Sequence, residues 1–287
     1  MINANHILEH NHDSTNRTLS NVYSNCFNVR SNNNIHICYM NVYFGGASYG
    51  MIYYMGMFDE FRKLNINRIY GNSAGALSAL LFICGFTSDD AKALFYKFVR
   101  IQNGIDLTKA HVDSLKLILS DHPNIYKNTN LYIGVTTPNG FIWKNTFESH
   151  VELVNTLLCS YHIPFLCSYD AKCEQQNAID GGLGISLLKD LPEDTLTIGA
   201  NNSSCKIDGY PTLFMIVKPP ETIADFYFYK GKYDIQNYFT RGIQAKNAFV
   251  MPSETSIPVE IWFMLRRIHP ITVSYSDIQK QFKGSNS

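Results

Sequence analysis

The first third of the chain alternates between hydrophobic patterns typical of strands and of helices. Residues 35–44 are rich in β-branched and aromatic side chains and predict a strand, which a Gly-rich turn follows. Apolar residues at helical spacing then predict a helix over 51–64. A short strand at 67–70, a second turn and a helix over 76–84 repeat this order. Successive strand–turn–helix units favour an α/β fold with a parallel sheet and helices on its faces.

The rest of the chain mixes helical and strand-like segments. The spacing of apolar residues predicts helices over 88–102, 108–120, 149–159, 234–249 and 257–268, and strands over 131–136, 141–144, 178–180 and 195–200. Residues 226–233 are aromatic and basic, a composition that suits a membrane interface. Because no strongly amphipathic helix accompanies this run, the sequence favours a core strand packed on both faces.

The composition indicates a folded protein without a general affinity for nucleic acid. Of the 287 residues, 45% are hydrophobic, which is enough to form a sizeable core. The 24 Lys and Arg residues balance the 24 Asp and Glu residues, so no bulk electrostatic attraction to nucleic acid is expected. With no run of 18 apolar residues and no apolar signal core near Met1, we expect neither a transmembrane helix nor a secretory signal.

The cysteines favour free thiols over a disulfide framework. They are dispersed and odd in number: Cys26, Cys38, Cys84, Cys159, Cys167, Cys173 and Cys205. Such a set is typical of an intracellular, reducing compartment, either the cytoplasm or the periphery of a membrane. Their spacings do not form the paired C-x₂-C units of a zinc site, so no metal is expected.

The strongest chemical signal is a G-x-S-x-G motif, Gly71-Asn72-Ser73-Ala74-Gly75, between a predicted strand and a predicted helix. A serine on a sharp strand-to-helix turn projects its hydroxyl above the sheet, and flanking glycines relieve the crowding of that turn. The following helix N-terminus favours negative charge at the site. The sequence therefore predicts Ser73 as a nucleophile, with a merely structural turn as the alternative.

A second glycine turn, Gly45-Gly46-Ala47-Ser48-Tyr49-Gly50, lies one strand–helix unit upstream of Ser73. In a parallel sheet, consecutive strand-to-helix turns meet at the same edge, so backbone N–H groups of this turn are placed to stabilise an oxyanion. A dinucleotide-binding turn is the alternative. It is disfavoured because Ala47 interrupts the G-x-G-x-x-G pattern and no acidic residue follows in a ribose-binding context.

A third signal is Asp180-Gly181-Gly182 at the end of a predicted strand. An aspartate at a strand end can reach a neighbouring turn and accept a proton from a nucleophile. An ordinary turn aspartate is the alternative reading. Together with the two glycine turns, the motif favours Asp180 as a general base.

Four stretches in this order resemble the patatin-like phospholipase family, most of all the branch of patatin-domain triacylglycerol lipases. They are residues 44–50, 69–77, 157–165 and 179–182. The resemblance spans about residues 40–200. Residues 1–34 are crowded with Asn, Ser and His and predict a disordered Asn-rich tail. With the resemblance, we expect a catalytic domain at 35–215 and a mainly helical C-terminal extension at 216–287 packed on that domain.

The resemblance implies a three-layer α/β/α fold with a mostly parallel central sheet and a serine hydrolase with a Ser–Asp dyad. By position, Ser73 is the nucleophile, Asp180 the general base, and the backbone of Gly45, Gly46 and Ala47 the oxyanion hole. The expected partners are a lipid ester substrate and a peripheral membrane or lipid-droplet surface. No cofactor is implied for the chemical step.

One departure from the family concerns Ala47, because the family usually has glycine there. If this position requires a positive φ, alanine costs about 1 kcal/mol or more and turns an N–H away from the oxyanion.

Two other functions stay open from the sequence. An α/β-hydrolase with a Ser–Asp–His triad would use Ser73, Asp180 and His269, or His162 if chain order is ignored. A catalytically inactive lipid-binding protein on the same fold is the other alternative, and Ala47 is the feature that keeps it open.

Overall fold

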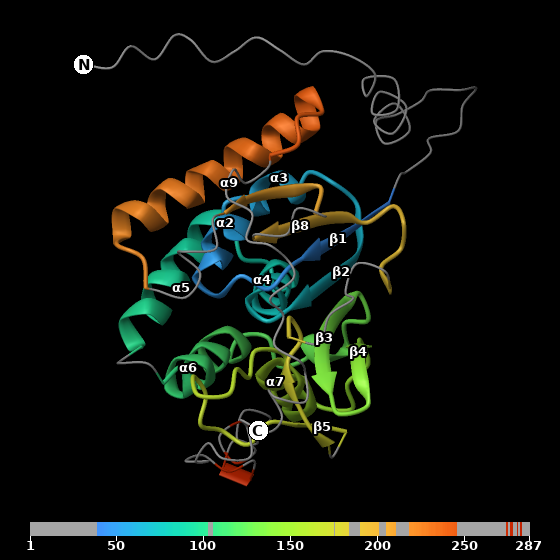
Figure 1. The fold of residues 1–287 in the computed structure, drawn as a ribbon, viewed down its shortest axis with the longest axis vertical. Coiled ribbons are helices and arrows are strands. Elements are labelled where there is room, and N and C mark those ends of the chain that lie inside the picture. Colours follow the sequence, from blue (N-terminus) through green and yellow to red (C-terminus); the bar gives the residue numbers. More distant parts are fainter. Residues whose placement is uncertain are drawn as a thin grey trace.

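The computed structural model contains alternating strands and helices around one sheet (Figure 1). The structure describes residues 39–102, 106–174, 176–183, 190–200, 205–210 and 218–245, together with 274, 276, 277, 280 and 282. The predicted tail at 1–34, the predicted helix at 257–268 and His269 lie outside these residues.

The described strands form a mostly parallel sheet in the order β4-β3-β2-β1-β8-β9, with β7 also paired to β3. The strands are β1 Met40–Phe44, β2 Ile66–Asn72, β3 Leu131–Thr137, β4 Gly140–Lys144, β7 Ile179–Asp180, β8 Leu196–Ala200 and β9 Ile207–Tyr210. Neighbours from β3 to β9 pair in parallel, whereas β4 and β7 are antiparallel to β3. A separate hairpin joins β5 Lys172–Cys173 to β6 Gln176–Asn177. The predicted α/β fold with a mostly parallel central sheet is confirmed.

The helices largely follow the hydrophobic spacing. They are α2 Met51–Met55, α3 Phe58–Phe61, α4 Ala74–Ile83, α5 Ser88–Ile101, α6 Thr108–Leu119, α7 His150–Ser160 and α9 Glu221–Arg241, with 3₁₀ turns η1 Ser48–Gly50 and η2 Ile125–Lys127. The single helix predicted over 51–64 is divided into α2 and α3 near Gly56. A Cβ at Gly56 would overlap the backbone carbonyl of Phe228, so α9 passes directly over this break.

Alternating side chains of β1 face two different hydrophobic clusters. Val42 and Phe44 belong to the large cluster, which includes buried residues of α2, α3, α4, α5, α6, α7 and α9. Tyr43 points to the opposite face and joins a smaller cluster with Tyr70, Leu191 and Cys205. The period of two along the strand therefore separates a helix-covered face from a second face rich in tyrosine.

The aromatic run 226–233 lies in helix α9, so the predicted core strand is wrong. A Cβ at Gly231 would overlap the backbone carbonyl of Tyr53, which shows how closely α9 packs on α2. Phe226, Tyr229 and Tyr233 point outward, with 58%, 60% and 61% of their surface exposed. Because aromatic residues occupy both the buried and the exposed face of this helix, no apolar stripe at helical spacing marks it in the sequence.

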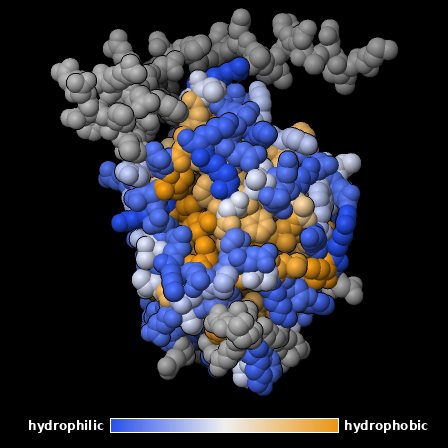
Figure 2. Space-filling view, turned by 180° about the vertical axis from the view of Figure 1, so that it is seen from behind, coloured by the Kyte–Doolittle hydropathy of each residue, from blue (hydrophilic) through white to orange (hydrophobic). Residues whose placement is uncertain are grey.

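Apolar residues gather in the middle of the face that is seen from behind, and hydrophilic residues border them (Figure 2). None of the helices in the described ranges is long and apolar enough to cross a membrane. The five cysteines that the structure describes are buried free thiols: Cys84, Cys159, Cys167, Cys173 and Cys205.

Candidate active site

Ser73 occupies a strained turn between β2 and α4. Its φ of 53° and ψ of −136° lie in a region that L-residues rarely adopt, and such strain is concentrated at functional sites. The glycines of the motif allow the turn to close, because a Cβ at Gly71 would lie 2.5 Å from the Gly75 carbonyl oxygen. A Cβ at Gly75 would overlap the carbonyl oxygen of Phe44. Both glycines are therefore required by close backbone approaches.

Ser160, at the end of α7, holds this turn in place. The Ser73 N–H donates to Ser160 Oγ at 3.0 Å, and Ser160 Oγ–H donates to the Gly134 carbonyl oxygen in β3 at 2.7 Å. Both bonds are buried, so they are protected from competition with water. The sequence analysis assigned Ser160 no role. A polar residue one turn beyond Leu157 on the predicted apolar stripe is the signal that could have identified it.

Asp180 reaches Ser73 because β7 pairs with β3 directly beyond the residues of β3 that pair with β2. β2 pairs with residues 131–134 of β3, and β7 pairs with residues 135–136. Since β4 occupies the other edge of β3, β2 and β7 lie end to end on one edge. The Asp180 N–H donates to the His162 carbonyl oxygen at 2.9 Å, and the Gly181 N–H donates to the Ser160 carbonyl oxygen at 2.9 Å.

Burial gives the Asp180 carboxyl an unusual proton affinity. Only 3% of the residue is exposed, and desolvation raises the pKa of Asp180 to about 7. The Ser73 side chain and the Gly182 N–H oppose this shift, because hydrogen bonds to the carboxylate lower its pKa. The Gly182 bond to Oδ1 measures 2.7 Å, whereas Oδ2 has no partner of standard geometry among the described residues. The interaction with Ser73 is therefore looser than a fully formed hydrogen bond.

The glycine turn after β1 lies beside the serine. A Cβ at Gly46 would lie 3.3 Å from the Cβ of Ser73. The Gly45 N–H donates to the Ile198 carbonyl oxygen at 2.8 Å, so it is used by the sheet. The N–H groups of Gly46 and Ala47 make no hydrogen bond with the described residues and are the donors that this turn offers.

Ala47 adopts a negative φ of −147°, so alanine meets no left-handed strain at this position. The residue with a positive φ is Ser48, at 45°. The feature that kept an inactive protein open in the sequence is therefore not a source of backbone strain.

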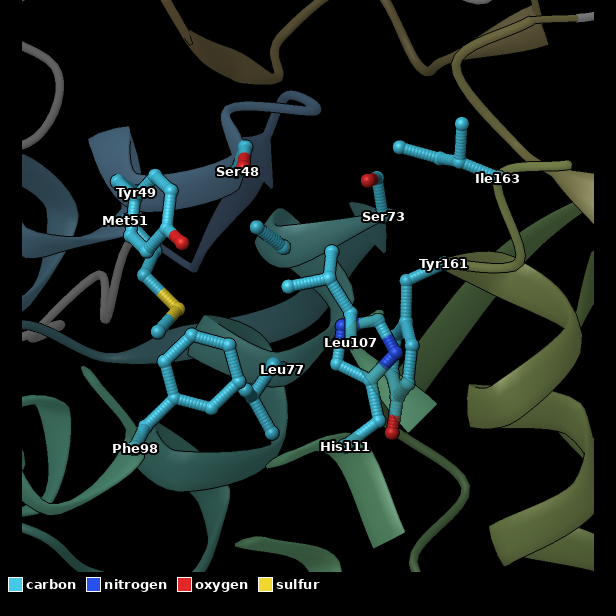
Figure 3. A pocket seen from close by; sticks show the side chains of 11 residues that line it. Ser48, Tyr49, Met51, Ser73, Leu77, Phe98, Leu107, His111, Tyr161 and Ile163 are labelled. Carbon is cyan, nitrogen blue, oxygen red and sulfur yellow. The ribbon is translucent and has the colours of Figure 1, made fainter. Parts of the chain in front are cut away.

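An apolar pocket opens next to Ser73 (Figure 3). It encloses about 500 Å³, counting its open mouth, and is lined by Ser48, Tyr49, Met51, Ser73, Ala74, Leu77, Phe98, Leu107, His111, Tyr161 and Ile163. The Ser73 hydroxyl lies at one end, and Leu77, Phe98 and His111 lie further along. Its mostly hydrocarbon and aromatic lining suits an apolar group next to Ser73.

His111 is a histidine near the serine that the sequence analysis did not identify. Its Nδ1 lies 3.7 Å from Cys167 Sγ and 3.4 Å from Tyr169 Oη. Burial lowers the pKa of His111 to about 3 and raises the pKa of the Cys167 thiol to about 12. Both groups are therefore neutral near pH 7, and His111 is a weak base.

Of the two histidines of the alternative triad, the structure describes His162 alone. The His162 ring packs edge-on against Tyr169, with centroids 5.0 Å apart, and its carbonyl binds the Asp180 N–H. His269 lies outside the described residues. Within the described ranges, no group of three His, Cys, Asp or Glu side chains is placed to hold a metal ion.

Comparisons with known proteins give two sequence relatives. A scan against family models finds no match. Patatin-like phospholipase domain-containing protein 5 of Mus musculus is 27% identical over 187 residues, covering 58% of this chain and 43% of the relative. The Homo sapiens protein of the same name is 27% identical over 177 residues, covering 55% and 41%. The chain spans less than half the length of these relatives.

Two solved structures are similar at low identity. VipD from Legionella pneumophila has a TM-score of 0.39 and 13% identity, over 56% of this chain and 49% of that chain. The type III effector protein ExoU has a TM-score of 0.38 and 11% identity, over 70% and 52%. In sequence, the chain is therefore similar to proteins named for a patatin-like phospholipase domain.

Proposed function

We propose that the chain hydrolyses carboxylic esters of phospholipids or acylglycerols through a Ser73–Asp180 dyad. The observation behind the proposal is the pairing of a strained serine with a buried aspartate whose pKa is raised to about 7. An ordinary aspartate, with a pKa near 4, is a weak base at neutral pH. Burial gives Asp180 the proton affinity of a histidine, so the dyad can act without one.

In the first half of the reaction, Ser73 Oγ forms a bond to the ester carbonyl carbon while its proton passes to Asp180. The developing oxyanion accepts hydrogen bonds from the N–H groups of Gly46 and Ala47. The tetrahedral intermediate then expels the alcohol. Asp180 returns its proton to the leaving oxygen, and the fatty acyl group stays on Ser73 as an ester.

In the second half, a water molecule attacks the acyl-enzyme carbonyl as Asp180 takes one of its protons. The bond to Ser73 Oγ breaks, Asp180 gives the proton back to that oxygen, and a fatty acid leaves. Because only ionised Asp180 accepts a proton, kcat/KM should rise with pH through about 7.

The pocket beside Ser73 supports a lipid ester as the substrate class. Its lining is mostly hydrocarbon and aromatic, which suits an acyl chain rather than a polar acid. The relatives are named as phospholipase domain-containing proteins. Phospholipids and acylglycerols present the same ester to Ser73, so a panel of both is needed to separate them.

Contact with a lipid surface is part of the same proposal. Phe226, Tyr229 and Tyr233 are exposed on α9, and amphipathic aromatic side chains suit a water–lipid interface. Co-sedimentation with phosphatidylcholine vesicles should weaken in Tyr229→Ser. Equal binding by this variant and the wild type would remove α9 from the proposal.

The test of the proposed chemistry is labelling with a fluorescent fluorophosphonate. We expect labelling of the wild type, loss in Ser73→Ala, and strong reduction in Asp180→Asn. Ser78→Ala is the matched control, because Ser78 is buried in α4 and its hydroxyl binds only the Ala74 carbonyl of its own helix. His269→Ala should label like the wild type.

Three outcomes separate the candidate functions. Loss of labelling in His269→Ala with folding intact would favour the Ser–Asp–His triad. No labelling of the folded wild type would favour the inactive lipid-binding protein. Labelling lost only with Ser73 and Asp180 supports the dyad, and the lipid panel then decides between phospholipids and acylglycerols.

A further inference from the structure

Asn72, the residue before the nucleophile, has a buried and only partly bonded side chain. The residue is fully buried, and its Oδ1 accepts a hydrogen bond from the Tyr43 hydroxyl at 2.7 Å. Its Nδ2 has no hydrogen-bond partner among the described residues. A buried amide donor without a partner costs about 1–3 kcal/mol, so its retention calls for an explanation.

The free amide nitrogen lies between the two loops that flank Ser73. A Cβ built on Gly46 would lie 3.1 Å from Asn72 Nδ2. A Cβ built on Gly182 would lie 3.1 Å from the same nitrogen and 3.0 Å from Asp180 Oδ1. The amide nitrogen and a carboxylate oxygen therefore both border the space that glycine leaves at position 182.

The Asp180 carboxyl group also has an oxygen atom without a hydrogen bond of standard geometry among the described residues. Asp180 Oδ1 accepts the Gly182 N–H, while Oδ2 is buried without a partner among the described residues. In this structure Asn72 Nδ2 and Asp180 Oδ2 are not hydrogen-bonded to each other. We propose that Asn72 is a positioning residue whose Nδ2–H donates to the carboxylate when Asp180 ionises and favours that ionised form for proton transfer. The inference rests on the proposed function for the role of Asp180 as a base.

Tyr43 fixes the direction of this amide. Its hydroxyl donates to Oδ1, which leaves Nδ2 as the amide atom that borders Gly46 and Gly182. The pKa of Tyr43 is raised well above its ordinary value of 10.0, chiefly by burial, so the hydroxyl keeps its proton and stays a donor near neutral pH. The chain from Tyr43 through Asn72 to Asp180 thus opposes the desolvation that favours the neutral acid.

Few other ionisable groups face Asp180. Tyr43 from β1 and Cys167 from the loop after α7 interact electrostatically with it. Burial keeps the pKa of Cys167 at about 12 and that of Tyr43 above 10, so neither changes charge between about pH 5 and 9. A titration of Asp180 in this range therefore reports its own protonation.

The experiment measures that protonation directly. Full-length protein carrying ¹³Cγ-labelled aspartate is titrated by NMR, and the Asp180 resonance is assigned by its absence in Asp180→Asn. In Asn72→Leu, which keeps the volume but removes the donor, we expect the Asp180 midpoint to rise by about one pH unit. The acidic limb of kcat/KM for a p-nitrophenyl ester should shift by the same amount.

Two further variants serve as controls. Asn41→Leu removes a buried amide of β1 whose Nδ2 binds Asp194 at 3.1 Å, and it should leave the Asp180 midpoint unchanged. Tyr43→Phe releases the Asn72 amide without altering either member of the pair. It should raise the midpoint in the same direction, and it decides the question if Asn72→Leu does not fold.

An unchanged midpoint in the folded Asn72 variant, or in Tyr43→Phe if that variant alone folds, overturns the inference. A fall in kcat without a shift would instead place the amide at the oxyanion loop beside Gly46. Because NMR needs no turnover, a wild type without esterase activity would reject the proposed function while the midpoints still test the Asn72–Asp180 interaction.

Discussion

Asp180 directly follows Asn72 along one edge of β3. Asn72, at the end of β2, pairs with Gly134, and Asp180 in β7 pairs with Val135. β2 leaves the sheet at this point to form the turn at Ser73, and β7 takes its place. The hydrogen-bonding edge of β3 thus brings Asn72 and Asp180, which are distant in the sequence, to the same site.

The buried carboxyl of Asp180 should make the protein less stable as pH rises. Its folded-state pKa of about 7 exceeds the unfolded value of 3.8, so the folded protein binds more protons between these values. The free energy of unfolding contributed by this group therefore falls as pH rises from about 4 to about 7. In Asp180→Asn, the melting temperature should exceed that of the wild type by several degrees at about pH 8, and by less at about pH 4.5.

Thermal denaturation at several pH values tests this expectation. Asp121→Asn is the matched control, because it makes the same substitution at an exposed aspartate. A difference between Asp180→Asn and wild type that stays constant from acid to neutral pH would contradict the buried, raised-pKa state of Asp180.

Substitutions in the glycine turn should separate strain from function. Ala47 has a negative φ, so Ala47→Gly relieves nothing, and we expect esterase activity to stay within about twofold of wild type. Ser48 has a φ of 45°, so Ser48→Gly should raise the free energy of unfolding by about 0.5–1 kcal/mol. Urea denaturation and esterase rates measure the two effects, and a large activity gain in Ala47→Gly would show that alanine does hinder the oxyanion loop.

Under the proposed function, filling the pocket should shorten the acyl chains that the site accepts. Leu77→Trp adds bulk from α4 into the space beside Ser73. We expect KM for a p-nitrophenyl ester of a long fatty acid to rise about tenfold, while hydrolysis of the acetate changes little, because a short acyl group stays near the nucleophile. Leu117→Trp on the exposed side of α6 is the control. Equal losses for both esters would mean that acyl chains bind elsewhere.

Removing the Ser160 hydroxyl should weaken the turn that carries Ser73. Ser160→Ala leaves the buried Ser73 N–H and the Gly134 carbonyl without their partner, which should cost about 1–3 kcal/mol in the free energy of unfolding and lower kcat. Ser114→Ala is a matched control, because Ser114 is also buried but its Oγ has no partner in the described residues. Similar losses in both variants, measured by urea denaturation, would deny Ser160 its supporting role.

Local patterns predicted most helices and strands around the site. Thr87 and Asp90 form the reciprocal hydrogen bonds of a capping box at the start of α5, as residue types at this spacing predict. The glycines at 71 and 75 likewise indicate the sharp turn at Ser73, because only glycine tolerates the close backbone approaches found there. Such features depend on neighbours within a few positions in the chain.

The aromatic helix α9 shows where local pattern is insufficient. Its residues 226–233 read as a strand because aromatic side chains occupy successive positions. The tertiary contacts of Gly56 and Gly231 hold this segment against α2 as a helix, and no neighbour in sequence reveals those contacts.

The sequence by itself determined the α/β order of elements, the strained turn at Ser73 and the glycines beside Asp180, because sterics and side-chain periodicity act locally. The tertiary structure alone decided that the Gly45 N–H belongs to the sheet, that Ser160 holds the turn at Ser73, and that Asn72 and Asp180 adjoin on one edge of β3. Those outcomes depend on which strands share an edge of β3 and on how completely water is excluded, and both arise only when distant segments pack together.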